Sequence, residues 1–153
     1  MYKSSVQEAY QLLYDVLSED GPFDGMLGFS HGATLAMMFL TQHSLTNILE
    51  PPWSMVGCAV FIAGPSPFDV DGRRLKGKVG EEVGARLLGI PTVHVVGMKD
   101  DLYEDAMKMY ELCDERSRVQ VIHEKGHVVP RDGEPLGRMV KAIRGLRGKM
   151  VNI

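Results

Sequence analysis

Apolar residues recur at helical spacing near the start of the chain. The recurring positions are Val6, Ala9, Tyr10, Leu13, Val16 and Leu17. This spacing predicts an amphipathic helix, and the acidic and turn-forming residues at positions 19–22 predict its end. Further helical patterns follow at residues 33–43, 102–114 and 136–146, with a weaker one around residues 80–88.

Four short apolar runs alternate with these helices, at residues 23–29, 56–63, 92–96 and 119–123. Each run is bounded by turn residues and has the length of a buried parallel strand. The alternation predicts an α/β fold in which helices cover both faces of a parallel sheet. The polar residues 64–80 predict a long loop, and we expect residues 1–153 to form a single domain.

Composition and charge exclude several classes of function. The 153 residues are 44% hydrophobic and 24% charged, as in a globular protein with a real core. A net charge of -3 and scattered basic residues argue against nucleic-acid binding. Neither G-x-x-x-x-G-K-[ST] nor G-x-G-x-x-G occurs, so a nucleotide site is not indicated.

Cysteine usage and hydropathy indicate a compartment. The two cysteines, Cys58 and Cys113, fit neither a disulfide framework nor a zinc site, which favours a reducing environment. No 18 consecutive residues are apolar, and the polar start "MYKSSVQEAY" lacks the apolar segment of a secretory signal. We therefore expect a cytoplasmic protein that does not bind a membrane.

Residues 28–32 read Gly-Phe-Ser-His-Gly and match the pattern G-x-S-x-G. In this pattern a strand turns sharply into a helix with the serine at the apex. A side chain in place of Gly28 or Gly32 should collide with the packed strand or helix, which explains both glycines. Ser30 is then a candidate nucleophile, and the backbone N–H of His31 a candidate oxyanion donor.

A nucleophilic serine needs a base and an acid that orients the base. Asp100 and Asp101 follow the apolar run "PTVHVV", and His127 lies in a glycine-containing loop after "VQVIH". The order serine, acid, histidine is that of α/β-hydrolases. Groups that follow parallel strands gather at one edge of the sheet, so we expect all three on that edge.

Each candidate also has a simpler interpretation. Ser30 could be a turn serine, because G-x-S-x-G arises by chance in roughly one chain in twenty of this length. Asp100 or Asp101 could cap the helix expected from residue 102, and His127 could be a surface residue. A coincidence of all three in the right order is much rarer than any one of them.

The other histidines indicate no metal site. His123 and His127 have the spacing H-x-x-x-H, but no cysteine pair or acidic ligand completes a zinc site. His94 lies inside an expected strand and is interpreted as a packed core residue. His43 is interpreted as a helix C-terminal residue in a favourable dipole. We expect neither a metal nor an organic cofactor.

The run "GPFDGMLGFSHGATLA" resembles the nucleophile segment of the FSH-type serine hydrolases, a family of fungal and animal esterases with an α/β-hydrolase fold. The resemblance continues through "CAVFIAG", "IPTVHVVGMKDD" and "EKGHVVP", and so covers nearly the whole chain from Val6 onward. It implies that Ser30 is the nucleophile, His127 the general base and Asp100 the orienting acid. In this family, glutamine is more usual at the position of His31. The difference leaves the backbone N–H unchanged.

The resemblance also implies a substrate class. The family includes carboxylesterases and fungal hydrolases that act on polyketides held as thioesters, so the expected substrate is a small ester or thioester. Adjacency to the triad or to strand ends selects Phe29, Pro65, Phe68 and Val128 as candidates to line the acyl pocket.

One family feature has no counterpart before Tyr2. Family members begin with strands that lead to a histidine-glycine loop, which supplies the second oxyanion donor. Without them the strand ending at Phe29 lacks a neighbour, and an open apolar edge must be covered. The chain is then an incomplete sequence, a chain completed by another polypeptide, or a shortened protein that dimerises through the edge. A half-built oxyanion hole predicts a rate about 100- to 1000-fold lower.

Two functions are therefore consistent with the sequence. The first is a serine esterase or thioesterase acting through an acyl-enzyme. The second is a non-catalytic module that keeps the triad residues by descent and serves in binding or assembly. Activity together with the mass in solution distinguishes them.

Overall fold

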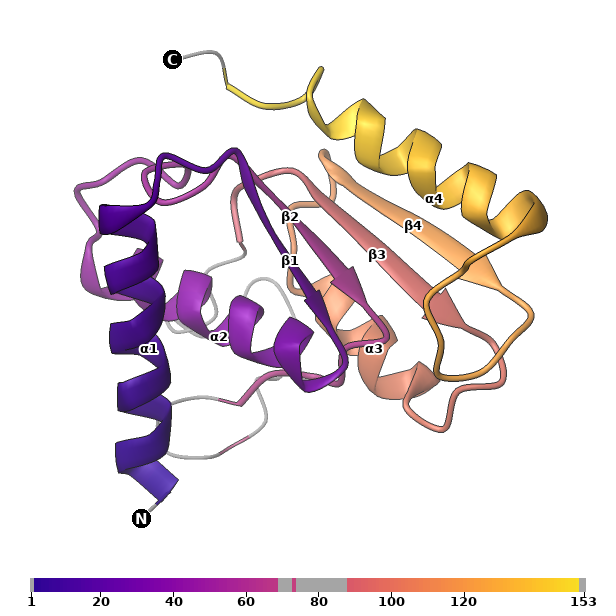
Figure 1. The fold of residues 1–153 in the computed structure, drawn as a ribbon, viewed down its shortest axis with the longest axis horizontal. Helices are drawn as coiled ribbons and strands as arrows, with labels where there is room; N and C mark the ends of the chain where they lie inside the picture. The colour runs from indigo at the N-terminus through magenta and orange to yellow at the C-terminus, as the bar shows by residue number, and fades with distance from the viewer. Residues whose placement is uncertain (1, 69–72, 74–87, 152–153) are drawn as a thin grey trace.

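The structure is a computed structural model that describes residues 2–68, 73 and 88–151 (Figure 1). Helices and strands alternate along this part of the chain. In order they are α1 (Tyr2–Glu19), β1 (Gly25–Phe29), α2 (His31–Thr46), β2 (Cys58–Ile62), β3 (Thr92–Gly97), α3 (Tyr103–Glu111), β4 (Arg118–His123) and α4 (Gly133–Leu146). None of the helices in the described ranges is long and apolar enough to cross a membrane.

The strands form one parallel sheet in the order β1-β2-β3-β4. Every residue of β2 and β3 is buried, which explains why both read as continuous apolar runs. The register places Phe29 beside Ile62 and Gly97 beside His123, so the carboxyl ends of the strands share one edge of the sheet. The predicted parallel α/β sheet is confirmed.

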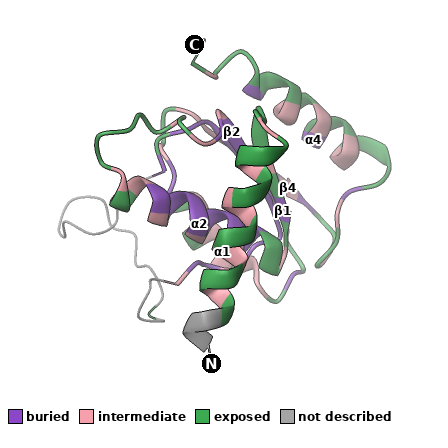
Figure 2. Ribbon diagram, turned by 60° about the vertical axis from the view of Figure 1, so that its left-hand side comes forward, coloured by how far each residue is buried: buried purple, intermediate pink, exposed green. Residues whose placement is uncertain are grey.

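Helices cover both faces of the sheet, as predicted (Figure 1). One core cluster joins Met37 and Phe39 of α2 to Phe61 of β2, with side chains of α1 packed around it. The other joins Met139 of α4 to Val95 of β3 on the opposite face. Figure 2 shows the contrast that results between the buried α2 and the largely exposed outer side of α1.

The ends of some elements differ from the sequence prediction. α2 begins at His31, two residues early, because it starts directly from the turn at Ser30. It continues past His43 to Thr46, where the Asn47 amide closes the last turn on the His43 carbonyl. α4 begins at Gly133, three residues early, because its first turn carries no apolar periodicity. The strand predicted at 23–29 begins two residues later, at Gly25, and the strand predicted at 56–63 is shorter at both ends. Pairing between these two neighbouring strands starts at Gly25 and Cys58.

Two expectations fall largely outside the described residues. The weaker helix around residues 80–88 is described only at Leu88, which bridges to Cys113. Of the loop expected over residues 64–80, the structure describes 64–68 and 73.

Strand β1 lies at an edge of the sheet and pairs, among the described residues, with β2 alone. Its outer residues are unusually exposed for large apolar side chains: Leu27 is 60% and Phe29 is 40% exposed. The expected open edge at this strand is therefore present in the part of the chain that the structure describes.

Candidate active site

Ser30 occupies a sharp turn between β1 and α2. Its backbone has φ 55° and ψ -123°, a left-handed φ that residues with a side chain rarely adopt. A Cβ on Gly28 would come within 2.5 Å of backbone atoms of Gly32 and Ala33, so only glycine fits there. The expectation for Gly32 is wrong: a Cβ there meets nothing within 4 Å, because that position faces open space.

The first turn of α2 contains the predicted oxyanion donor. The N–H of Ser30 is already used, since it donates to the Ile62 carbonyl at 2.9 Å. The N–H groups of Ala33 and Thr34 both reach back to the Ser30 carbonyl. The N–H of His31 lies in the same turn, where a helix offers no internal acceptor, so its predicted role as an oxyanion donor stays open to it.

Asp100 lies just after β3, and each of its carboxylate oxygens has a partner. Oδ1 accepts the backbone N–H of Leu102 at 2.9 Å, and Oδ2 accepts the Nδ1–H of His127 at 2.7 Å. Its side chain is only 2% exposed. Asp100 therefore contacts His127, as expected of an orienting acid, and also bonds the backbone near the start of α3, as expected of a capping residue. The helix itself begins at Tyr103, and Leu102 holds the N-cap position. Asp101, the other candidate acid, is exposed.

His127 links the acid to the serine. Its Nε2 lies 2.9 Å from Ser30 Oγ, across 97 residues of sequence. With Nδ1–H donated to Asp100, Nε2 carries the lone pair that accepts the Ser30 hydroxyl proton. The ring of Phe29 lies beside the His127 ring at 5.2 Å. The structure therefore brings the predicted serine, histidine and acid into one hydrogen-bonded chain.

The loop that carries His127 is held against the end of β3. A Cβ on Gly97 would overlap the carbonyl oxygens of Lys125 and Gly126, so this glycine permits the close approach. The N–H of Lys99 donates to the Lys125 carbonyl at 3.1 Å. The sequence places Gly97 after a strand but does not reveal this contact, because its partner lies 28 residues further along.

His123 anchors the other side of that loop and was not predicted to do so. It is 2% exposed, and its Nδ1 accepts the backbone N–H of Lys125 at 3.2 Å. Burial lowers the pKa of His123, and the positive charges of Lys125 and Arg138 add to the effect while Asp100 opposes it. A neutral His123 keeps the acceptor that this loop requires.

The residues expected to line the acyl pocket are distributed around the triad. Phe29 and Val128 adjoin Ser30 and His127 in sequence and are each 40% exposed. Pro65 is half-buried, and its carbonyl accepts the hydroxyl of Thr34 at 2.8 Å, which ties the segment after β2 to α2. Phe68 is half-buried. The role of these four residues in binding the acyl group stays a prediction.

The remaining histidines lie away from this chain of residues. His94 is 1% exposed, with Phe61 and Tyr110 against its ring, as expected for a core residue. His43 lies in the last turn of α2, where Tyr14 and Glu50 bond its two ring nitrogens. In the described ranges, no three His, Cys, Asp or Glu side chains are grouped to hold a metal ion.

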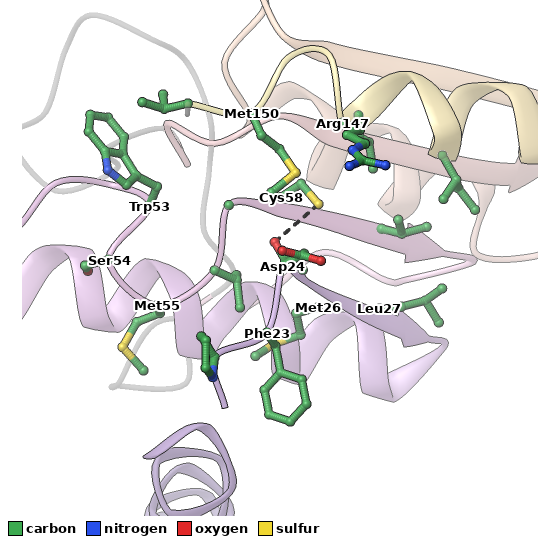
Figure 3. Close-up of a pocket in the computed structure, with 18 residues that line it drawn as sticks. Phe23, Asp24, Met26, Leu27, Trp53, Ser54, Met55, Cys58, Arg147 and Met150 are labelled. Carbon is green, nitrogen blue, oxygen red and sulfur yellow. Dashed lines mark hydrogen bonds between the residues drawn. The ribbon is translucent and has the colours of Figure 1, made fainter. Parts of the chain in front are cut away.

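A cavity of about 850 Å³ lies elsewhere, at the amino ends of β1 and β2 (Figure 3). Its wall includes Phe23, Leu27, Trp53 and Met150, and none of Ser30, Asp100 or His127. Because the triad residues follow the carboxyl ends of their strands, this cavity lies at the opposite end of the sheet from the candidate active site.

The sheet, the strained turn and the linked serine, histidine and aspartate define an α/β hydrolase. The chain belongs to the serine hydrolase family: the family model described as "Serine hydrolase (FSH1)" matches residues 2–138.

Curated relatives are longer than this chain. It is 34% identical over 149 residues to "Hydrolase phiM" of Talaromyces stipitatus, covering 94% of this chain and 58% of that protein. It is 31% identical over 151 residues to "Esterase FPY3" of Fusarium mangiferae, covering 96% of this chain and 67% of that protein. The chain thus spans about three fifths of these relatives.

Solved structures share the fold. The monoacylglycerol lipase of Paleococcus ferrophilus superposes with a TM-score of 0.65 at 14% identity, over 94% of this chain and 76% of the other. A fungal esterase of Rhizomucor miehei superposes with a TM-score of 0.63 at 12% identity, over 94% and 59%. At these identities the likeness concerns the fold alone.

Proposed function

We propose that this chain cleaves a small carboxylic ester or thioester through an acyl-enzyme on Ser30. The observation that carries the proposal is the continuous hydrogen-bonded chain from Asp100 through His127 to Ser30. Membership of the serine hydrolase family supports it. The names of the relatives "Hydrolase phiM" and "Esterase FPY3" support ester cleavage as the reaction class.

The proposal gives each residue a role that the geometry supports. Ser30 Oγ attacks the acyl carbon while its proton passes to His127 Nε2, and the carbonyl oxygen becomes an oxyanion beside the His31 N–H. The intermediate collapses, and the leaving alcohol or thiol takes the proton from His127. Water then attacks the acyl-enzyme, with His127 accepting and returning the proton. Asp100 holds Nδ1–H throughout and stabilises the imidazolium.

The acyl group of the substrate is expected against apolar side chains. Phe29 lies beside His127 and is partly exposed, which supports a place for it next to the bound acyl group. Pro65, Phe68 and Val128 are proposed to complete this surface. Replacing Phe68 by alanine should change the preference for acyl chain length, measured with a series of p-nitrophenyl esters. An unchanged preference would remove Phe68 from the proposed pocket.

The open edge of β1 bears on activity. One candidate oxyanion donor, the His31 N–H, lies in the described residues, and a second normally comes from a loop that follows another strand. We propose that residues 1–153 alone, with this one donor, react about 100- to 1000-fold more slowly than a complete site.

The test is labelling by a fluorophosphonate followed by intact-mass measurement. We expect one adduct per chain, lost in Ser30→Ala and in His127→Ala. Ser18→Ala and His31→Gln are matched controls that should still label, because Ser18 is exposed on α1 and the glutamine keeps the backbone N–H. A folded chain that does not label would overturn the proposal and favour a non-catalytic binding role.

A further inference from the structure

His123 is the last residue of β4, and it lies where two loops of the candidate active site meet. The register places it beside Gly97, the last residue of β3. One loop leaves β3 and carries Asp100, and the other leaves β4 and carries His127. Because only 2% of its surface is exposed, the His123 ring contacts these parts of the protein rather than solvent.

His123 forms a hydrogen bond with each of the two loops. Its carbonyl accepts the N–H of Met98 at 2.8 Å, two residues before Asp100. Its Nδ1 accepts the N–H of Lys125 at 3.2 Å, two residues before His127. One residue therefore fixes the backbone close to both the acid and the base of the candidate triad.

The His123 ring is also packed against Gly97. A Cβ at position 97 would come within 2.9 Å of His123 Cε1. The same Cβ would overlap the carbonyl oxygens of Lys125 and Gly126. The ring and the loop backbone thus lie against one glycine, and this close packing opposes rotation of the ring away from the Lys125 N–H.

The contacts of His123 select one form of its ring. Because Nδ1 accepts from Lys125, the ring proton lies on Nε2. His127 has the opposite tautomer, since its Nδ1–H donates to Asp100. Burial lowers the pKa of His123, and the positive charges of Lys125 and Arg138 lower it further. The Asp100 carboxylate opposes this effect but contributes less, so the ring is held as a neutral acceptor.

We propose that His123 is a positioning residue whose neutral ring holds the loop that carries the general base. This role rests on the proposed function, in which His127 is that base. His127 forms two bonds, of 2.7 Å to Asp100 and 2.9 Å to Ser30 Oγ, and both depend on where its loop lies. A displacement of about 1 Å at a catalytic group lowers a rate about 100-fold. His123 itself transfers no proton.

Three variants separate this role from a general contribution to folding. His123→Leu removes the acceptor and keeps a bulky side chain. In His123→Asn, the side-chain oxygen stands near the place of Nδ1 and accepts the Lys125 N–H. Val121→Ala is the matched control, because Val121 is buried two residues earlier in β4 and packs in the core beside α4. Alanine there lowers stability without removing a bond to either loop.

The first test reads the ring tautomers by two-bond ¹H–¹⁵N NMR at pH 8 and needs no substrate. In the unchanged chain we expect the proton of His123 on Nε2 and that of His127 on Nδ1. In His123→Leu, His127 should populate both tautomers, because its bond to Asp100 is no longer held. His123→Asn and Val121→Ala should each keep the single His127 tautomer.

Two results of the NMR test would overturn the inference. One is a proton on Nδ1 of His123, which could not then accept the Lys125 N–H. This result comes from the unchanged chain, so it is obtained even if a variant does not fold. The other is a His127 tautomer that stays single in a folded His123→Leu chain. Far-UV circular dichroism checks the fold of each variant.

The second test measures the rate of fluorophosphonate labelling at Ser30, together with kcat and KM for a p-nitrophenyl ester. We expect His123→Leu to lower the labelling rate and kcat about 100-fold with little change in KM, because the base is displaced and the acyl contacts are kept. His123→Asn should restore most of the rate, and Val121→Ala should react like the unchanged chain.

The kinetic outcomes separate this inference from the proposed function. Equal losses in His123→Leu and His123→Asn, or a full rate in His123→Leu, would overturn the positioning role alone. An unchanged chain that shows the expected tautomers but does not label would overturn the proposed function, while the role of His123 in holding the His127 loop would stand.

Discussion

The two oxygens of Asp100 hold different parts of the site. Oδ2 orients His127, whereas Oδ1 fixes the Leu102 N–H at the entry to α3. The carboxylate therefore joins the proposed catalytic site to the local backbone structure. Substitutions that remove one of these two contacts should be distinguishable from substitutions that remove both.

Asp100→Asn should lower kcat/KM for an ester about 10⁴-fold while the chain stays folded, because the amide stabilises the wrong His127 tautomer. Asp100→Ala should lose activity to a similar extent and stability as well, because the Leu102 N–H loses its acceptor. Kinetics with a p-nitrophenyl ester and urea unfolding measure the two effects. Asp101→Asn, at an exposed position, is the control. A loss below tenfold in Asp100→Asn would contradict the assigned role.

The two glycines around Ser30 should respond oppositely to alanine. A Cβ at position 28 meets backbone at 2.5 Å, and such overpacking costs about 1–3 kcal/mol. A Cβ at position 32 meets nothing, and alanine there should raise stability by up to about 1 kcal/mol. Urea unfolding of Gly28→Ala and Gly32→Ala measures both free energies. Equal effects would mean that the turn is not packed as described.

At the scale of elements, α1 is attached to α2 by a small polar cluster inside an apolar contact. The Tyr14 ring packs edge-on against Phe39 at 4.8 Å, and its hydroxyl lies 2.9 Å from His43 Nδ1. His43 Nε2 lies 3.0 Å from Glu50, beyond the end of α2. Hydrogen bonds from His43 and Ser54 hold the pKa of Glu50 below its usual range. The cluster fixes α1 against α2.

Tyr14→Phe should lower the free energy of unfolding by about 0.5–1.5 kcal/mol, because it keeps the ring and removes one hydrogen bond. Tyr10→Phe is the matched control, since Tyr10 also packs on Phe39 but has no contact with His43 among those described. Chemical denaturation measures both variants. A loss in Tyr10→Phe as large as in Tyr14→Phe would show that the hydroxyl bond to His43 contributes nothing specific.

Sequence reasoning succeeded at this scale where a pattern is local. Continuous apolar runs predict β2 and β3 because both faces of these strands are buried. The G-x-S-x-G pattern and the carboxylate after β3 predict that Ser30 and Asp100 lie near one another, because both follow the ends of parallel strands. His123 and Thr34 were missed because their partners, the Lys125 amide and the Pro65 carbonyl, are backbone groups that any sequence carries. The end of α2 was misplaced because the Asn47 contact with His43 has no periodic signal.

For the whole molecule, the core contains a histidine that cannot easily be charged. Burial, and to a lesser degree the nearby Arg118, lowers the pKa of His94 to about 3. Its Nε2 lies 2.9 Å from the Thr92 hydroxyl, and burial keeps the ring neutral. The folded and unfolded chains therefore bind different numbers of protons in mild acid.

Stability should fall as the pH is lowered from about 6.5 toward 3. In that window the unfolded chain protonates position 94 and the folded chain does not, so acid favours unfolding. Above the ordinary pKa of histidine, His94 is neutral in both the folded and the unfolded chain, so its full contribution to stability is present. Urea unfolding at several pH values measures the slope, and His94→Gln should flatten it whatever its effect at pH 8. An unchanged slope in that variant would assign acid sensitivity to other groups.

The separation of the triad along the chain has a kinetic consequence. Ser30 and His127 are 97 residues apart, and their bond exists only when β1 and β4 stand in one assembled sheet with β2 and β3 between them. Contacts of such long sequence separation form late and slowly in folding. The reactivity of Ser30 during refolding should therefore appear last, after the helical signal has recovered. Its appearance reports that the sheet is complete.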